Sequence, residues 1–194
     1  MVSPMTYEAA DALLGERLSP SAAAHSRRVA ETAAQLAARF GVDVATSRLA
    51  GLLHDWDREQ TPEQLFSAAA EAGLTVTPAD ETVPYLLHAR TGAAALRRAF
   101  PGAPDAVITA VAHHTVGSSD MTDLDKIVYV ADMIEPGRDY PGVASLRQLS
   151  TTVTLGELFA VAYQQSILYL IGSRKRIHPD TVAVWNKLVA GEQS

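Results

Sequence analysis

Helix-start and helix-stop signals recur along this chain, and they restrict its fold more than any other feature. Ser19-Pro20 combines a preferred N-cap residue with a proline in the first turn, and the helical pattern that follows ends at Gly41. The stretch TPEQ, residues 61–64, reads as a capping box, and the segment after it ends at Gly73. Apolar residues recur at helical spacing between these signals. The pattern predicts helices over most of the chain.

Other segments show the same spacing of apolar residues, with Asp43 as a cap for the first of them and Asp180 or Thr181 for the last. The sequence predicts these further helices over residues 44–56, 84–100, 104–114, 124–134, 155–171 and 181–189. The β-branched segments VITAV and KIVYV lack the turn residues that would pair them as strands. We therefore predict an all-α fold in a single domain over residues 1–194, with a core over about 20–140 and C-terminal helices over about 150–190 packed on it.

The composition is that of a folded soluble protein, with 47% hydrophobic and 20% charged residues. The formal net charge of -6 argues against nucleic-acid binding, which normally needs a basic surface. The chain has no cysteine, which excludes disulfides and thiolate metal sites and fits a reducing compartment. No signal peptide is recognisable, and no apolar stretch approaches the roughly 20 residues needed to span a bilayer. We expect a cytoplasmic protein without nucleic-acid or membrane partners.

Two good metal ligands, His54 and Asp55, stand side by side at the end of an apolar helical segment. Neighbouring side chains in a helix point about 100° apart, so one helix face cannot carry both. A helix terminus allows the two to converge, and an aspartate can bridge two cations with its two oxygens. Further histidines and an aspartate lie in other predicted helices, at His25, His88, His114 and Asp132. Imidazole and carboxylate without sulfur suit Fe, Mn, Zn or Ni, whereas calcium prefers oxygen ligands.

The order H…HD…D formed by these residues resembles the HD superfamily of metal-dependent phosphohydrolases. The segments LLHARTGA, AHHTVGSSDMTDLDKIVYVADMIEPGRDYPGV and IHPDTVAVWN sharpen the likeness. Together they resemble the YqeK family, bacterial HD proteins that cleave diadenosine tetraphosphate symmetrically to two ADP. The resemblance runs from about His25 to Asn186, nearly the whole chain. It implies a helical HD bundle with a metal site between its helices.

The resemblance also implies the metal ligands, which are His25, His54, Asp55, His88, His114 and Asp132. Asp55 would bridge two divalent or trivalent ions, and the family leans toward iron, with manganese, nickel or zinc as alternatives. Of the neighbouring His113 and His114, the family pattern favours His114 as the ligand, and His113 as a packing or supporting residue. Asp125 either orients a ligand histidine or is an ordinary charge at a helix N-terminus. The family also suggests a homodimer.

Several cations are candidates to hold phosphate oxygens of a dinucleoside polyphosphate. Arg58 lies one turn from His54, and Arg28 lies three residues from His25. Arg138 follows a Pro-Gly turn that could fold it over the site, and Lys126 lies in the last ligand helix. Arginine offers bidentate contacts to phosphate and lysine a point charge. Solvated surface cations are the competing interpretation for each.

The expected reaction is attack on phosphorus by metal-activated water, with Asp55, Arg58, Lys126 and Arg138 as the catalytic groups. Alternatives are another nucleotide substrate of the HD superfamily and a catalytically silent nucleotide-sensing module. A purely structural metal is a further alternative, but a closed site would leave no position for water.

Overall fold

The computed structural model describes residues 5–191, and over that range the chain forms helices and no strand. The helices, in chain order, are α1 (Tyr7–Arg17), α2 (Pro20–Phe40), α3 (Val44–Leu53), α4 (Pro62–Glu71), α5 (Pro78–Thr82), the 3-10 helix η1 (Pro84–Leu87), α6 (His88–Ala99), α7 (Asp105–His113), α8 (Asp123–Ile134), α9 (Val143–Leu149), α10 (Leu155–Gly172) and α11 (Pro179–Val189). The predicted all-α fold is confirmed. None of the helices within residues 5–191 is both long and apolar enough to cross a bilayer.

Local capping explains where the major helices begin and end. The Ser19 hydroxyl accepts a hydrogen bond from the backbone N–H of Ala22, and α2 ends at Gly41 in the left-handed conformation, with φ of 74°. The predicted capping box at the start of α4 is present, with Thr61 and Gln64 bonding each other's backbone N–H groups. These bonds satisfy the donors that the first turn of a helix leaves unpaired.

Three helix ends differ from the prediction. α3 ends at Leu53, so His54 occupies its C-cap position and the following residues form turns. The segment that starts at Pro84 is first a 3-10 helix, and α6 begins only at His88. The cap of α11 is the His178 side chain, which accepts from the N–H of Asp180, and not Asp180 or Thr181 as we predicted.

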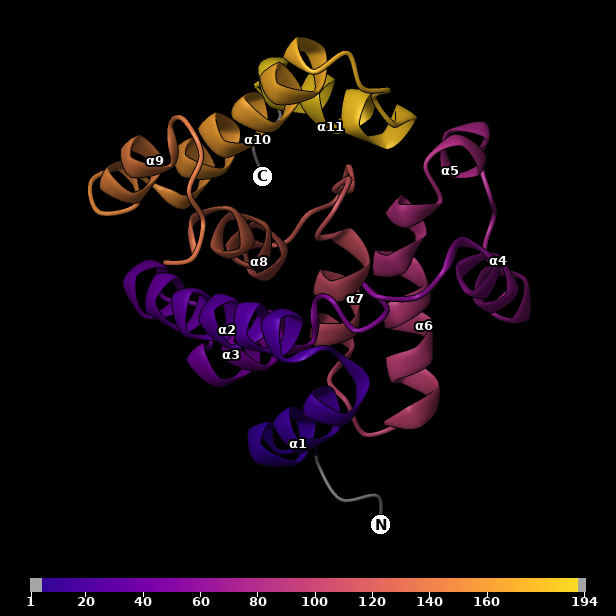
Figure 1. Ribbon diagram of the computed structural model, residues 1–194. Helices are drawn as coiled ribbons and strands as arrows, with labels where there is room; N and C mark the ends of the chain where they lie inside the picture. Colours follow the sequence, from indigo (N-terminus) through magenta and orange to yellow (C-terminus); the bar gives the residue numbers. More distant parts are fainter. Residues whose placement is uncertain (1–4, 192–194) are drawn as a thin grey trace.

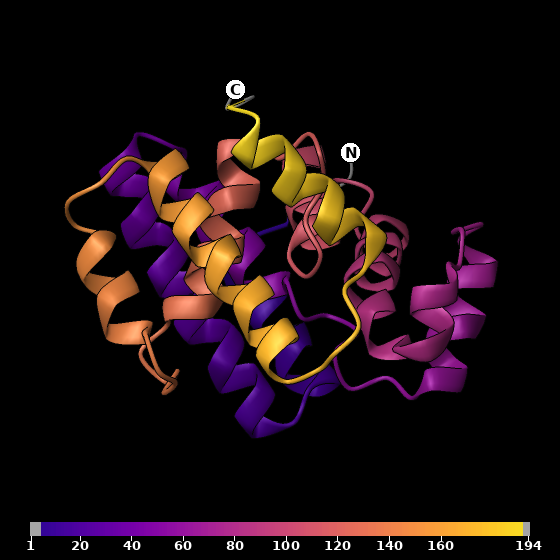
Figure 2. The same cartoon turned by 90° about the horizontal axis from the view of Figure 1, so that it is seen from above.

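Helix α2 packs on both α3 and α8 (Figure 1). Its contact with α3 is a backbone contact: a Cβ on Gly51 would lie 3.0 Å from the Ala30 Cα atom. Helices α10 and α11 lie across the α8 side of the bundle (Figure 2). The ends of α2, α3, α6, α7 and α8 therefore face one another in the interior.

A buried carboxylate ties α5 to α6 and to the start of α11. Asp80, 1% exposed, accepts from the Thr77 backbone N–H at 2.8 Å and from Arg90 Nη2 at 2.7 Å. His178 Nε2 lies 3.6 Å from its other oxygen. Burial raises the pKa of Asp80, but the bonds from Thr77 and Arg90 outweigh burial and lower it below 3.8.

We expect Asp80→Asn to lower the free energy of unfolding at pH 7 by about 2–4 kcal/mol, because Arg90 loses the charge it pairs with. The folded-state pKa lies below the unfolded value, so this contribution is complete above about pH 5 and is lost as the pH falls through the folded-state pKa. Urea unfolding from pH 7 to pH 3 should show the difference from wild type shrinking. The exposed neighbour variant Glu81→Gln is the control. A difference that stays constant with pH would contradict the assignment.

Candidate metal centre

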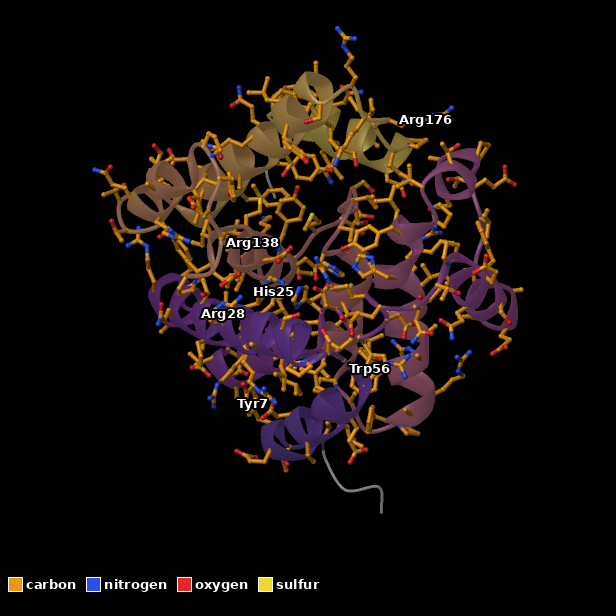
Figure 3. The ribbon with its side chains drawn as sticks, viewed as in Figure 1. Tyr7, His25, Arg28, Trp56, Arg138 and Arg176 are labelled. Atoms are coloured by element: carbon orange, nitrogen blue, oxygen red, sulfur yellow. The ribbon has the colours of Figure 1, made fainter. Side chains whose placement is uncertain are left out.

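The structure brings the predicted ligands together from helices far apart in the sequence. His25 lies in the second turn of α2, His54 and Asp55 follow α3, His88 opens α6, His114 caps α7, and Asp132 lies near the end of α8. Two groups of these residues have ligand atoms within 4.8 Å of one another, namely His25, His54 and Asp55, and Asp55, His88 and His114. Figure 3 shows His25 pointing into the space between α2 and α8.

Asp55 stands between the two groups and turns one oxygen to each. Its Oδ2 atom lies 3.5 Å from His25 Nε2 and 3.2 Å from His54 Nε2. Its Oδ1 atom lies 3.2 Å from His88 Nε2 and 3.4 Å from His114 Nε2. The carboxylate is fully buried. Asp55 thus has the geometry of a bridge between two ligand sets.

Asp132 completes the first set, since its Oδ1 atom lies 2.9 Å from His25 Nε2 and 3.7 Å from His54 Nε2. The His25 half is our name for the group formed by His25 Nε2, His54 Nε2, Asp132 Oδ1 and Asp55 Oδ2. The nitrogens of His88 and His114, with Asp55 Oδ1, form the His88 half.

Hydrogen bonds at Nδ1 fix how the imidazoles face the centre. His54, His88 and His114 each donate Nδ1–H to the carbonyl three residues earlier, with distances of 2.8, 2.6 and 2.8 Å. His25 instead donates Nδ1–H to Glu135 Oε1, 110 residues away, at 3.1 Å. In the neutral rings the Nε2 atoms therefore carry lone pairs, which is the form that binds metal.

The convergence of these lone pairs fits a bound cation. His88 Nε2 and His114 Nε2 are 3.0 Å apart. Both rings have placed their one hydrogen elsewhere, so two lone pairs and Asp55 Oδ1 face one another. In the His25 half, the buried Nε2 atoms of His25 and His54 have no hydrogen-bond partner, and in the His88 half neither has Asp55 Oδ1. Buried acceptors without a donor cost free energy, and a transition-metal ion among nitrogen and oxygen ligands removes that cost.

Electrostatics keep the carboxylates ionised. Burial raises the pKa of Asp55, but the imidazoles of His54, His114 and His88 around it outweigh burial and hold the pKa well below its ordinary value. Burial likewise raises the pKa of Asp132, but its contact with His25 and the nearby His54 and Arg138 outweigh burial and lower it strongly. The centre therefore holds two negative charges ready for cations.

Two of the predicted cationic side chains, Arg58 and Arg138, bond the carboxylates of the predicted ligands Asp55 and Asp132. Arg58 Nη1 donates to Asp55 Oδ2 at 2.6 Å. Arg138 bonds the Asp132 carboxylate through Nη2 and the Asp132 carbonyl through Nε at 2.7 Å. The side chains of Arg58 and Arg138 are each 32% exposed, so they form the solvent-facing edge of the His25 half.

The other two predicted cations lie elsewhere. Arg28 donates to both oxygens of Glu135, at 2.5 and 3.2 Å, and so contacts a partner of His25. Lys126 lies about 120° around α8 from Asp132, because six residues separate them. It bonds Asp123 at 3.1 Å and lines a separate cavity with Lys187. Lys126 thus shares helix α8 with Asp132 but lies on another face of it.

Residues 22–137 of the chain match the HD domain family. The chain belongs to this family. A relative from Bacillus subtilis (strain 168), named "Bis(5'-nucleosyl)-tetraphosphatase, symmetrical", is 32% identical over 187 residues, which cover 96% of this HD chain and 100% of the relative. A relative of the same name from Halalkalibacterium halodurans is 32% identical over 165 residues, covering 85% and 87%.

A solved structure shares the whole fold. The crystal structure of a predicted HD superfamily hydrolase involved in NAD metabolism from Clostridium acetobutylicum superposes with a TM-score of 0.91 at 28% identity. The match covers 97% of this chain and 100% of that one. The HD fold predicted from the sequence is thereby confirmed.

The neighbouring histidines of α7 separate as the HD pattern suggests. His114 faces the centre, while His113 turns away and its Nδ1 lies 3.1 Å from Asp125 Oδ2. The same Asp125 oxygen accepts from the Thr122 N–H at 2.9 Å as part of a capping box. Asp125 therefore serves the start of α8 and orients His113, which is outside the ligand groups.

Sequence reasoning missed two residues beside the HD site. Glu135, 1% exposed, orients His25, and an acidic residue one turn after Asp132 was the available signal. Tyr85 supplies the carbonyl that orients His88, and its ring centroid lies 4.5 Å from that of His88. Burial and the charge of Asp55 raise the pKa of Tyr85 to about 12, so its hydroxyl stays protonated at neutral pH.

Proposed function

We propose that this HD protein is a metal-dependent phosphohydrolase that cleaves diadenosine tetraphosphate symmetrically to two ADP. The observation that carries the proposal is Asp55, whose two oxygens face two separate pairs of imidazole nitrogens. Such a bridge suits two ions side by side, which is the arrangement of many phosphoester-cleaving sites. The name and full-length match of the Bacillus subtilis relative support diadenosine tetraphosphate as the substrate.

The residues that would hold the two ions are His25, His54, Asp55 and Asp132 on one side and Asp55, His88 and His114 on the other. We propose iron as the resident metal, with manganese, nickel or zinc as alternatives that the same nitrogen and oxygen ligands accept. We also propose a homodimer, by the resemblance to the YqeK family, and a cytoplasmic location, which the absence of cysteine supports.

Bound metal ions supply Lewis acidity toward phosphate oxygens and toward the attacking water. Arg58 and Arg138 lie at the exposed edge and each uses only part of its guanidinium on a carboxylate, so further N–H groups are available for non-bridging phosphate oxygens. Their positive charges stabilise the negative charge that builds on those oxygens. The oxygen bridging the two central phosphorus atoms leaves with one ADP, and the oxygen of water stays on the other.

Incubation of the metal-loaded protein with diadenosine tetraphosphate, followed by separation of the products, tests the function. We expect ADP as the sole product, and loss of the reaction when a chelator removes the metal. AMP plus ATP would keep the metal centre and overturn the position of attack. No turnover by a protein with two ions bound would reject this substrate, in favour of another nucleotide or of a nucleotide-sensing role.

A further inference from the structure

The turn that follows α8 carries two of the groups that hold the His25 half in place. We call residues 135–138 the Glu135 turn. Glu135 orients His25 through Nδ1, and Arg138, at the end of the turn, bonds the Asp132 carboxylate. Figure 3 shows Arg138 close to His25, between α2 and α8. The position of this turn therefore decides where two metal ligands point.

Arg147, a half-buried residue of α9, binds the backbone of this turn. Its Nε donates to the Ile134 carbonyl at 2.9 Å, and its Nη2 donates to the carbonyls of Glu135 at 2.7 Å and Arg138 at 2.8 Å. Because α8 ends at Ile134, carbonyls at its end lack the partners that a continuing helix would supply. The planar, always-charged guanidinium bonds the Ile134 carbonyl and, at the same time, two carbonyls of the Glu135 turn.

The Glu135 side chain of this turn is held by a second arginine, from helix α2. Arg28 of α2 grips the Glu135 carboxylate, and the Gly137 N–H donates to Glu135 Oε2 at 2.5 Å. A Cβ at Gly137 would lie 2.6 Å from Arg28 Nη2, so the turn packs closely on that guanidinium. Arg28 thus fixes the carboxylate, while Arg147 fixes the main chain that carries it.

The His88 half has no comparable dependence on the turn. His88 and His114 are oriented by carbonyls three residues earlier, that of Tyr85 in η1 and that of Val111 in α7. We infer that Arg147 is a positioning residue for the His25 half of the metal centre, acting through the Glu135 turn and leaving the His88 half unaffected. The inference rests on the proposed function only in taking the two halves as ion sites.

Titration of chelator-stripped protein with Mn²⁺ by calorimetry tests this asymmetry. In a His88→Ala background, where the His25 half remains, we expect Arg147→Ala to weaken Mn²⁺ binding by about 10–100-fold, the usual effect of losing a residue that supports a ligand. In a His25→Ala background, the same change should leave binding by the His88 half within about two-fold. Arg147→Lys, which keeps the charge but not the fork, should fall between wild type and Arg147→Ala.

Arg39→Ala is the matched control. Arg39 lines the same cavity of about 530 Å³ as Arg147 and also donates to one backbone carbonyl, that of Val153 at 2.7 Å. We expect it to change neither binding event. Thermal unfolding shows whether each variant is folded. If Arg147→Ala does not fold, Mn²⁺ binding by the two halves is compared in Arg147→Lys instead.

Equal weakening of both halves, or of neither, would overturn the inference, as would a single binding event in the wild type. Failure of the proposed function is separate. A wild type that binds two Mn²⁺ ions but cleaves no diadenosine tetraphosphate would reject the substrate, while the asymmetry between the halves would still stand.

Discussion

Replacing Asp55 by alanine should lower the rate of diadenosine tetraphosphate cleavage by at least about 100-fold. The purified variant should also contain neither of the two metal ions. Loss of a residue that merely supports a ligand already costs about 10–100-fold, and Asp55 is shared by both halves. The change also removes the carboxylate that separates the two pairs of imidazoles. Turnover assays and metal analysis of the same preparation measure the two losses together.

Asp80→Asn is the control for this experiment, because it removes another buried carboxylate that lies outside the metal centre. Below its melting temperature it should keep both metal and turnover. An Asp55→Ala protein with wild-type turnover would contradict the bridging role, and so would one that keeps two ions.

Stripping the metal should lower the melting temperature by about 8–16 °C. A ligand at 1,000 times its dissociation constant stabilises the folded state by about 4 kcal/mol, and for a chain of this size each kcal/mol shifts the midpoint by about 2–4 °C. The physical reason is the cluster of buried lone pairs, in which His88 Nε2 and His114 Nε2 lie 3.0 Å apart while both rings donate their Nδ1–H to carbonyls.

Calorimetric scans with and without a chelator measure this shift, and adding Mn²⁺ back should restore the higher midpoint. The Asp55→Ala variant should show no response to the chelator, because it has no metal to lose. An unchanged midpoint in a protein shown to be free of metal would mean that the cluster is not a bound-cation site.

The helices could be predicted because their signals are local. Ser19 and Thr61 cap helices with bonds that reach only three residues along the chain. The start of α11 was predicted less well, because His178 caps it while also facing Asp80, 98 positions away in the chain. A histidine is not a usual capping residue, and its buried neighbour is visible only in the fold.

The difference between local signals and contacts far apart in the chain also separates the site residues that could be predicted from those that could not. The predicted metal ligands stand out by residue type and by their places near helix ends. Arg28 shares a helix face with His25, as its spacing suggests, yet it contacts Glu135 and no ligand directly. The pairing of His25 with Glu135 spans 110 residues. No local pattern encodes it, so the residues that orient His25 required the folded structure.

The contact between Gly51 and α2 sets the distance between two members of one ligand set. The approach of the helices that carry His25 and His54 is limited by main-chain atoms, since a Cβ at position 51 would lie 3.0 Å from Ala30 Cα and 3.1 Å from the Val29 carbonyl oxygen. Main-chain atoms cannot move aside as the end of a flexible side chain can. Any side chain at position 51 would therefore push α3 away from α2, and with it His54 away from His25.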